Sequence, residues 1–168
     1  MGRPGPLNRV LPGGGDIVLR PATHADAALL LEWRNDPDAV RFSLTGRAVG
    51  ASPHASWLAA RLAGNAPRLW IAEEGSDPVG QVRVDLDGAT GTVSIAVAPA
   101  HRGRGVGTGI LRALLIEMEA DSQVGTLQAT VHADNAASLR AFERAGFQGR
   151  DGPGHRFVVF ERSVEAKR

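Results

Sequence analysis

The chain has 168 residues, of which 43% are hydrophobic and 22% charged, the size and composition of one globular domain. Its 19 basic and 18 acidic residues leave a formal charge of +1, so the charge does not indicate nucleic acid or an anionic membrane as a partner. No apolar run approaches the roughly 20 residues of a membrane-spanning helix, and Cys is absent, so we expect a cytoplasmic protein without disulfides.

Two more absences restrict the chemistry. The sequence contains no Tyr, so no phenol can act as a catalytic acid. Its one lysine, Lys167, lies near the C-terminus, which excludes a Gly-Lys-Ser/Thr phosphate loop and makes Schiff-base catalysis implausible. Because Cys and the His-Glu-x-x-His motif are both missing, we expect no metal site.

Composition divides the chain into three segments. Residues 1–15 are rich in Gly and Pro and predict a flexible arm. Residues 16–162 carry regular hydrophobic patterns and predict one domain, and residues 163–168 form a polar tail.

The first part of this domain predicts a strand and two helices. In chain order they are a strand at 17–20 that Pro21 ends, a helix capped by Thr23 and broken at 35–38, and a helix from Ser52.

The pattern then changes to the period of a β-sheet. Strands are predicted at 69–72, 79–85 and 92–97, joined by turns at 74–78 and 87–88. This order is typical of an antiparallel meander.

The remaining chain alternates helices and strands after a glycine-rich loop. We predict a helix around 110–118, a strand at 127–131, a helix at 135–145 that Gly146 ends, and closing strands at Phe147 and 155–161. Together the elements predict a single α/β (α+β) domain with a mixed sheet.

The glycine-rich loop joins the strand ending near Pro99 to the following helix. Glycines at 103, 105, 107 and 109 permit tight turns with backbone amides directed inward. Amides at a helix start, together with the helix dipole, bind pyrophosphate well, and Arg102 and Arg104 add charge-assisted contacts.

A dinucleotide-binding turn is an alternative that the spacing excludes. That turn requires Gly-x-Gly-x-x-Gly, and counted from each of the first three glycines the last position holds Thr108, Ile110 or Arg112.

The spacing Arg-x-x-Gly-x-Gly, formed by Arg102, Gly105 and Gly107, resembles the acetyl-CoA loop of the GNAT superfamily of N-acetyltransferases. A second motif, which begins at Asn135 and ends at Gly146-Phe147, resembles that family's Asn-x-x-Ser/Ala-x-x-x-Tyr-x-x-x-Gly-Phe. The resemblance implies a mixed central sheet, flanked by helices and splayed between its fourth and fifth strands.

The resemblance also implies how acetyl-CoA would bind. Pantetheine would lie in the splay like an added strand, paired with the Ile95 and Val97 backbone beside a bulge at 95–97. Asn135 would hydrogen-bond the pantetheine arm, with Ser138 nearby and Phe142 packed against the arm. The alternatives are a helix cap for Asn135, which can coexist with the first role, and a solvated helix residue for Ser138. The amides that would hold the pyrophosphate belong to Arg102, Gly103, Arg104, Gly105, Val106, Gly107 and Thr108.

The implied reaction is direct acetyl transfer to a primary amine, with the amide of Ala96 or Val97 stabilising the oxyanion. The family's usual acid, a Tyr, is Phe142 here, so His132, Ser138 or water would protonate the departing thiolate. For His132, a partly exposed strand histidine without this role is the alternative.

The general base is left open by the sequence. The family often has Glu where this chain has Thr92, which favours a proton relay through water. Asp85, Asp87 and Glu32 are the other candidates.

Acceptor recognition is expected in the first two helices and the meander. The Trp-Arg-Asn-Asp, His-x-x-Trp and Gly-Gln-Val-Arg segments resemble amino-sugar N-acetyltransferases of the pseudaminic acid pathway, whose acceptors are nucleotide-linked. The expected acceptor residues are Trp33, Arg34, Asn35, His54, Trp57, Gln81 and Arg83.

These interpretations have alternatives. Trp33 and Trp57 are equally well interpreted as core residues, and Arg34 as a surface ion-pair residue. For the whole chain the alternatives are a ribosomal-protein-type N-terminal acetyltransferase and a non-catalytic CoA-binding module. We expect a monomer or homodimer with a small-molecule amine as its partner.

Overall fold

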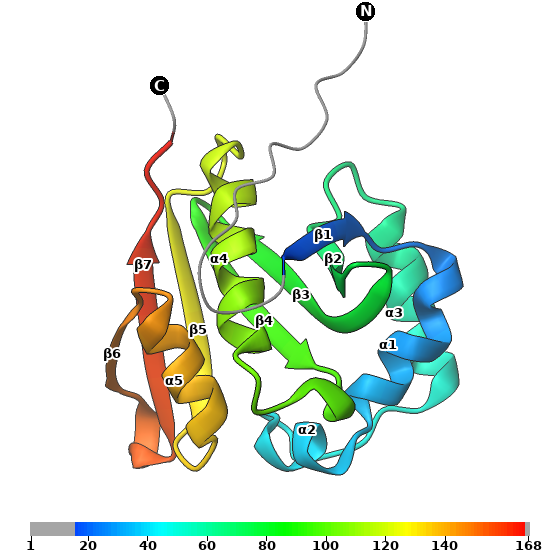
Figure 1. The fold of residues 1–168 in the computed structure, drawn as a ribbon, viewed down its shortest axis with the longest axis horizontal. Helices are drawn as coiled ribbons and strands as arrows, with labels where there is room; N and C mark the ends of the chain where they lie inside the picture. Colours follow the sequence, from blue (N-terminus) through cyan, green and yellow to red (C-terminus); the bar gives the residue numbers. More distant parts are fainter. Residues whose placement is uncertain (1–15, 167–168) are drawn as a thin grey trace, which may run out of the picture.

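A computed structural model describes residues 16–166, so the predicted arm at 1–15 lies outside the described residues. The domain is built on a seven-stranded sheet of order β1-β2-β3-β4-β5-β7-β6 (Figure 1). Its strands are β1 (Ile17–Pro21), β2 (Leu69–Glu74), β3 (Asp77–Asp87), β4 (Thr90–Val97), β5 (Thr126–His132), β6 (Gln148–Asp151) and β7 (Phe157–Ser163). All neighbouring strands are antiparallel except β4 and β5, so the predicted mixed sheet is confirmed.

The helices lie on both faces of the sheet. They are α1 (Ala27–Arg34), α2 (Pro37–Phe42), α3 (Ala51–Leu62), α4 (Val106–Glu119) and α5 (Ala136–Arg144), with short 3-10 turns at His24–Asp26, Pro99–His101 and Pro153–His155. One face is covered by α4 and α5, and the other by α1 and α3. Within residues 16–166 no helix is long and apolar enough to cross a membrane.

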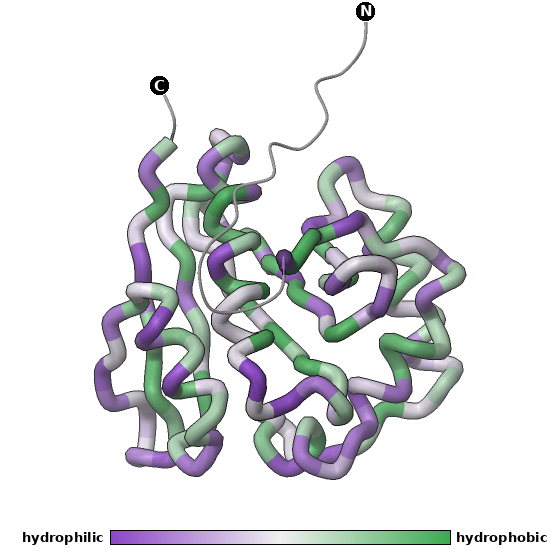
Figure 2. Tube along the Cα trace, viewed as in Figure 1, coloured by the Kyte–Doolittle hydropathy of each residue, from purple (hydrophilic) through white to green (hydrophobic). Residues whose placement is uncertain are grey.

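Alternation along β3 places two kinds of side chain on the two faces of the sheet. Val82 and Val84 are buried against α4, whereas Gln81 and Arg83 point to the face that α1 and α3 cover. Hydrophobic segments concentrate along the central strands, and polar ones at the loops (Figure 2). One face of β3 therefore carries apolar side chains packed against α4, and the other carries the polar side chains of Gln81 and Arg83.

The gap at the centre of the sheet follows from how β4 and β5 pair. Their parallel pairing is confined to Thr90–Thr92 against Thr126–Gln128, and the strands diverge beyond it (Figure 1). The predicted splay is thus confirmed. The bulge expected at 95–97 is not found: β4 pairs with β3 in one unbroken register from Thr90 to Val97. Loss of pairing with β5, without any insertion in β4, is enough to open the gap.

Helix α2 is an element that the sequence analysis missed. Residues 35–38 do end α1, but Asp36 then caps a new helix, accepting hydrogen bonds from the N–H groups of Asp38 and Ala39 (3.2 Å each). Pro37 occupies the first position of this helix, where its missing N–H costs nothing. An Asp-Pro pair is a helix-start signal as well as a breaker.

At the C-terminus the sheet is slightly longer than the sequence suggested. Strand β7 includes Ser163, the first residue of the segment assigned to a polar tail. The N–H of Val164 donates to the carbonyl oxygen of Gly125 (2.9 Å), and its side chain packs against the core.

Candidate active site

Beyond Thr92 one edge of β4 no longer pairs with β5, and among its backbone groups the Val97 carbonyl oxygen accepts from Nε of Arg102 (3.2 Å). The Ala98 N–H donates to the Val79 carbonyl oxygen (2.8 Å), so alternate residues of β4 direct their backbone groups toward β3. Ala96 belongs to this set, and its carbonyl oxygen would lie 2.5 Å from a Cβ on Gly80. Ile95 and Val97 belong to the other set and face the gap. Of the two amides expected for an oxyanion, only that of Val97 therefore faces the gap.

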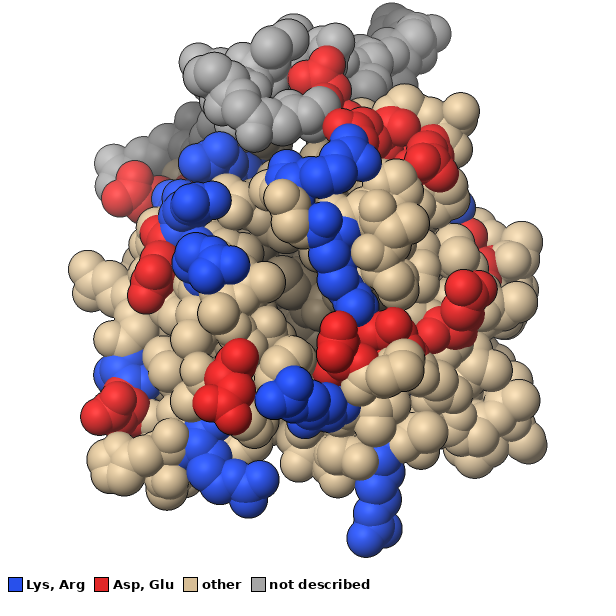
Figure 3. Space-filling view, turned by 60° about the horizontal axis from the view of Figure 1, so that its bottom comes forward, with Lys and Arg blue, Asp and Glu red and all other residues tan. Residues whose placement is uncertain are grey.

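The glycine turn places a helix start at the end of this edge. Gly103 and Gly105 have φ values of +76° and +78°, a conformation that favours glycine. Helix α4 begins at Val106 without a side-chain cap, so its first N–H groups remain available to a ligand. Seen from the end that carries α2, the surface has a central hollow with basic side chains on its rim (Figure 3). This backbone conformation is compatible with an anion site at the turn, and the binding itself stays a prediction.

The two arginines of the turn contact carboxylates of the chain. Arg102 pairs with Asp36 (2.8 Å) and Asp38 (3.4 Å), and its Nε donates to the Val97 carbonyl oxygen (3.2 Å). Arg102 thus joins α2 to the end of β4. The exposed Arg104 pairs with Glu74 (3.0 Å). The sequence analysis expected both guanidinium groups at the pyrophosphate and did not identify Asp36 as a partner.

Helix α5 begins on the opposite side of the gap. The Asn135 side chain accepts a hydrogen bond from the Ser138 N–H (3.2 Å) and caps the helix, the alternative role considered for it. Phe142 is only 2% exposed, stacked on Phe160 and edge-on to Phe147. Phe142 mainly fills the core, and little of its surface is left for pantetheine.

His132 ends β5 and contacts helix α2. Its ring lies between Phe42 of α2 (5.5 Å between centroids) and Phe157 (5.4 Å), and the side chain is 17% exposed. Its Nδ1 accepts from the Asp134 N–H (3.1 Å), so the neutral ring carries its proton on Nε2. The neutral ring thus retains one N–H that can donate a hydrogen bond.

Two residues expected to bind the acceptor have structural contacts instead. Trp33 is 4% exposed and lies in the core under α1 and α3, so it cannot stack on an acceptor. The Asn35 side chain donates to the Val49 carbonyl oxygen (2.7 Å) and accepts from the Val49 N–H (2.8 Å). Asn35 therefore fixes the loop between α2 and α3.

Of the other five expected acceptor residues, four come together, and Gln81 lies on the same face of the sheet. Trp57 has Arg83 over its ring (5.4 Å) and His54 at 5.4 Å, and Arg34 is close enough to both Arg83 and His54 to affect their electrostatics. Burial, and then the charge of Arg34, lowers the pKa of His54, which favours its neutral form. Gln81 lies opposite Ala96 in the sheet register, on the same face as Arg83.

The carboxylates considered as bases lie away from the Val97 end. Asp85 pairs in register with Thr92 and is bound by Arg61 and Arg83, and these interactions outweigh its burial and lower its pKa. Asp87 and Glu32 are exposed.

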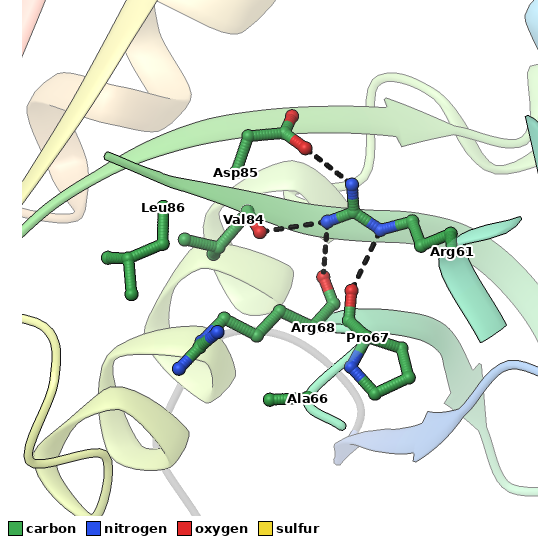
Figure 4. Close-up of a pocket in the computed structure, with 7 residues that line it drawn as sticks. All are labelled: Arg61, Ala66, Pro67, Arg68, Val84, Asp85 and Leu86. Carbon is green, nitrogen blue, oxygen red and sulfur yellow. Dashed lines mark hydrogen bonds and ion pairs between the residues drawn. The ribbon is translucent and has the colours of Figure 1, made fainter. Parts of the chain in front are cut away.

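A shallow pocket lies beside Asp85, at the far end of β3 from the glycine turn (Figure 4). In it Arg61 donates to Asp85 and to the carbonyl oxygens of Pro67, Arg68 and Val84. Its guanidinium holds the chain together there and is not available to a ligand.

The comparison with known families agrees with this backbone geometry. The family model described as "Acetyltransferase (GNAT) domain" matches residues 16–148. The chain belongs to the GNAT acetyltransferase family. As a GNAT acetyltransferase it is an enzyme of the acyltransferase class, and no group of three or more His, Asp or Glu side chains within residues 16–166 is arranged to hold a metal ion.

Relatives of this GNAT domain act on different acceptors. It is 26% identical to the aminoglycoside N(6')-acetyltransferase type 1 of Klebsiella pneumoniae over 90% of this chain and 87% of that protein. A crystal structure of an aminoglycoside acetyltransferase with coenzyme A and kanamycin superposes with a TM-score of 0.70, at 22% identity over 88% of this chain and 94% of that one. RimL, a ribosomal L7/L12 alpha-N-protein acetyltransferase in complex with coenzyme A, has a TM-score of 0.76 at 12% identity over 95% of this chain and all of that one. These likenesses support the fold and leave the acceptor open.

Proposed function

We propose that this GNAT domain transfers the acetyl group of acetyl-CoA directly to a primary amine of a small molecule, a nucleotide-linked amino sugar. Acetyl-CoA as the donor is supported by one observation: the edge of β4 that faces the gap leads directly to the glycine turn and the start of α4. Ile95 and Val97 direct backbone groups into the splay, and the turn of Gly103 and Gly105 presents amides beyond them. An extended amide-containing arm that ends in a diphosphate matches this sequence of groups.

Structural relatives support this donor. Proteins of the same fold are described with coenzyme A or acetyl-CoA bound, among them a putative acetyltransferase of Salmonella typhimurium. Residues 102–108 would hold the pyrophosphate mainly with their amides, because the guanidinium groups of Arg102 and Arg104 are occupied by carboxylates.

In this site the transfer would rely mainly on backbone groups and water. The Val97 N–H, facing the gap, would stabilise the oxyanion that forms when the amine attacks the thioester carbonyl. Most of the acceleration would come from holding the two reactants in line. Phe142 has no acidic proton, so His132 in its imidazolium form, or a water molecule, would protonate the departing thiolate. The thiolate is a fair leaving group, because the pKa of its thiol is roughly 8.5. The amine would lose its proton to water, since the carboxylates lie elsewhere.

The amino-sugar acceptor rests on two supports. The acceptor-face segments resemble amino-sugar acetyltransferases, and the aminoglycoside relative also modifies an amine on a sugar. Four of the expected residues cluster on that face, as described above, whereas Trp33 and Asn35 support the scaffold.

The test is thiol release from acetyl-CoA with a panel of acceptors. Nucleotide-linked amino sugars should accelerate release, and mass spectrometry should find one added acetyl group on the amine. Activity on peptides alone would reject the amino-sugar proposal.

Protein N-terminal acetylation is the second candidate, favoured by the likeness to RimL over 95% of the chain. The same panel tests it with peptides that carry free N-termini. Thermal stabilisation by coenzyme A without turnover on any amine would instead favour a non-catalytic CoA-binding module.

A further inference from the structure

We propose that Arg34 forms an anion-binding subsite on the acceptor face, with Arg83, His54 and Trp57 around it, and that this subsite takes a phosphoryl group of the acceptor. The inference deepens the proposed function and rests on it for the identification of this face with the acceptor. It assigns the residues that would meet the phosphoryl charge of such an acceptor.

The first observation is that Arg34 has no partner. Among residues 16–166 its side chain makes no hydrogen bond and no ion pair, and its Nη1 is a fully buried nitrogen without an acceptor. The residue as a whole is half-buried at the end of α1. A buried guanidinium nitrogen without an acceptor destabilises the free protein, because water is lost and nothing replaces it.

The second observation is that the surroundings add positive charge. Burial, and then the charge of Arg83, lowers the pKa of Arg34, although arginine stays protonated at neutral pH. The carboxylate that pairs with Arg83 is Asp85, which Arg61 also binds. No carboxylate within residues 16–166 pairs with Arg34, so a negative group from outside would fill the missing position.

The third observation is that the subsite is partly exposed and lies on the side of Arg83 toward the Val97 end of β4. The Arg83 side chain is 31% exposed, and Arg83 lies opposite Ser94 in the register. Along α3, Arg61 contacts Asp85, Trp57 contacts Arg83, and His54 is close enough to Arg34 for the charge of Arg34 to lower the pKa of His54. Arg34 therefore lies beyond Arg83 in the direction of Gln81 and Ala96, toward the Val97 end.

The chemistry of the group that fits follows from this geometry. Asp85 pairs with Arg61 and Arg83 and leaves the charge of Arg34 uncompensated within the described residues. A phosphate, which can accept several charge-assisted hydrogen bonds, would balance this charge. Trp57 offers a half-buried ring beside them, with an apolar surface for a sugar or base. An acceptor with several ammonium groups, such as kanamycin, would be repelled.

The first experiment measures binding by calorimetry to protein saturated with coenzyme A, so that the glycine turn is already occupied. Glucosamine 6-phosphate should bind at least about 10-fold more tightly than glucosamine, and Arg34→Gln should abolish that preference. The matched control Arg112→Gln, which removes an exposed arginine of α4, should keep it. Equal binding of the two sugars, or a preference that survives in Arg34→Gln, would overturn the subsite.

The second experiment needs no sugar and no turnover. Arg34→Met should raise the melting temperature by about 2–4 °C, because it removes a buried unpaired charge. Inorganic phosphate should raise the melting temperature of the CoA-saturated wild type and not that of Arg34→Met, whereas acetate at the same ionic strength should have a smaller effect. Equal effects of phosphate on both proteins would contradict the proposal, and an equal effect of acetate would contradict the phosphoryl assignment.

These results separate the two proposals. Arg34-dependent phosphate binding without acetylation of any sugar nucleotide would retain the subsite and reject the proposed function. Acetylation of sugar nucleotides with unchanged KM in Arg34→Gln would retain the function and reject the subsite.

Discussion

The two sides of the active site are built from different parts of the chain. On the acetyl-CoA side the ligand would meet backbone: the edge of β4 and the amides of the glycine turn, while Arg102 and Arg104 are bound to carboxylates. On the acceptor side the ligand would meet side chains, and Arg34 has no counter-charge within the described residues. An arginine in a binding motif can hold the scaffold, and an inconspicuous helix-end arginine can be left for a ligand.

The difference teaches where specificity resides. Backbone amides are present whatever the side chains are, so the donor side depends only on glycine conformations and a helix start. The acceptor side depends on which charges find partners after folding, and that can change with single substitutions. Four substitutions test this contrast, from the largest expected effect to the smallest.

Gly105→Glu should weaken coenzyme A binding by at least about 100-fold, measured by calorimetry. Its φ of +78° is strained for any other residue, and a carboxylate would fill the amide cradle with negative charge. Gly88→Glu is the control, because Gly88 has a similar φ of +58° in the turn between β3 and β4, at the far end of the sheet. Unchanged affinity in Gly105→Glu would contradict the backbone site.

Arg20→Met should lower the free energy of unfolding by about 2–3 kcal/mol, the opposite sign to Arg34→Met. Arg20 donates to both carboxylate oxygens of Asp26 (2.9 and 2.8 Å), whose side chain is 8% exposed, so its removal leaves a buried charge. Chemical denaturation measures both variants. The same sign for the two would show that pairing does not distinguish these arginines.

This pair also predicts a pH dependence. The hydrogen bonds from Arg20 outweigh burial and hold the pKa of Asp26 below its ordinary value. A carboxylate whose pKa is lowered by folding stabilises the folded protein at pH values above its pKa in the unfolded chain, about 3.9. This stabilisation is lost as the pH falls below that value. The difference in stability between wild type and Arg20→Met should therefore narrow below about pH 4.

Gly80→Ala should lower the free energy of unfolding by about 2 kcal/mol and reduce kcat. A Cβ there would lie 2.5 Å from the Ala96 carbonyl oxygen and 2.8 Å from Cδ1 of Ile110, so β4 must shift where it faces the gap. At Gly125 a Cβ would meet ordinary contacts of 3.6 Å and more, and Gly125→Ala should change neither quantity. Normal stability and kcat in Gly80→Ala would show that this close approach is not required.

Arg102→Gln should lower the free energy of unfolding by about 1 kcal/mol and raise the KM for the acceptor more than the KM for acetyl-CoA. The reason is that Arg102 joins α2 to the end of β4 through Asp36, Asp38 and the Val97 carbonyl oxygen. Arg104→Gln removes an exposed ion pair and should have a smaller effect on stability. A dominant effect of Arg102→Gln on acetyl-CoA would restore the role expected from the motif.

Much of the fold follows from local patterns in the sequence. The alternation of Val82 and Val84 with Gln81 and Arg83 is a short-range signal, and so is the spacing of the glycines before the helix that follows Gly105. The structure has the strand and the helix that these signals predict. The turn glycines also report backbone conformation directly, because Gly103 and Gly105 adopt positive φ values. Helix α2 carried such a signal too, in Asp36-Pro37, which was interpreted as a break only.

What the sequence by itself determined, then, is everything set by neighbours along the chain: the element order, the glycine turn and the family motifs. Only the tertiary structure decided how the arginines are used, because an ion pair such as Arg102 with Asp36 joins residues far apart in the chain. Tertiary structure also decided that Trp33 is buried in the core, whereas its neighbour Arg34 has no partner within residues 16–166. Adjacent residues on a helix point in different directions, and the packing of distant elements determines which of them is buried, paired or left to bind a ligand.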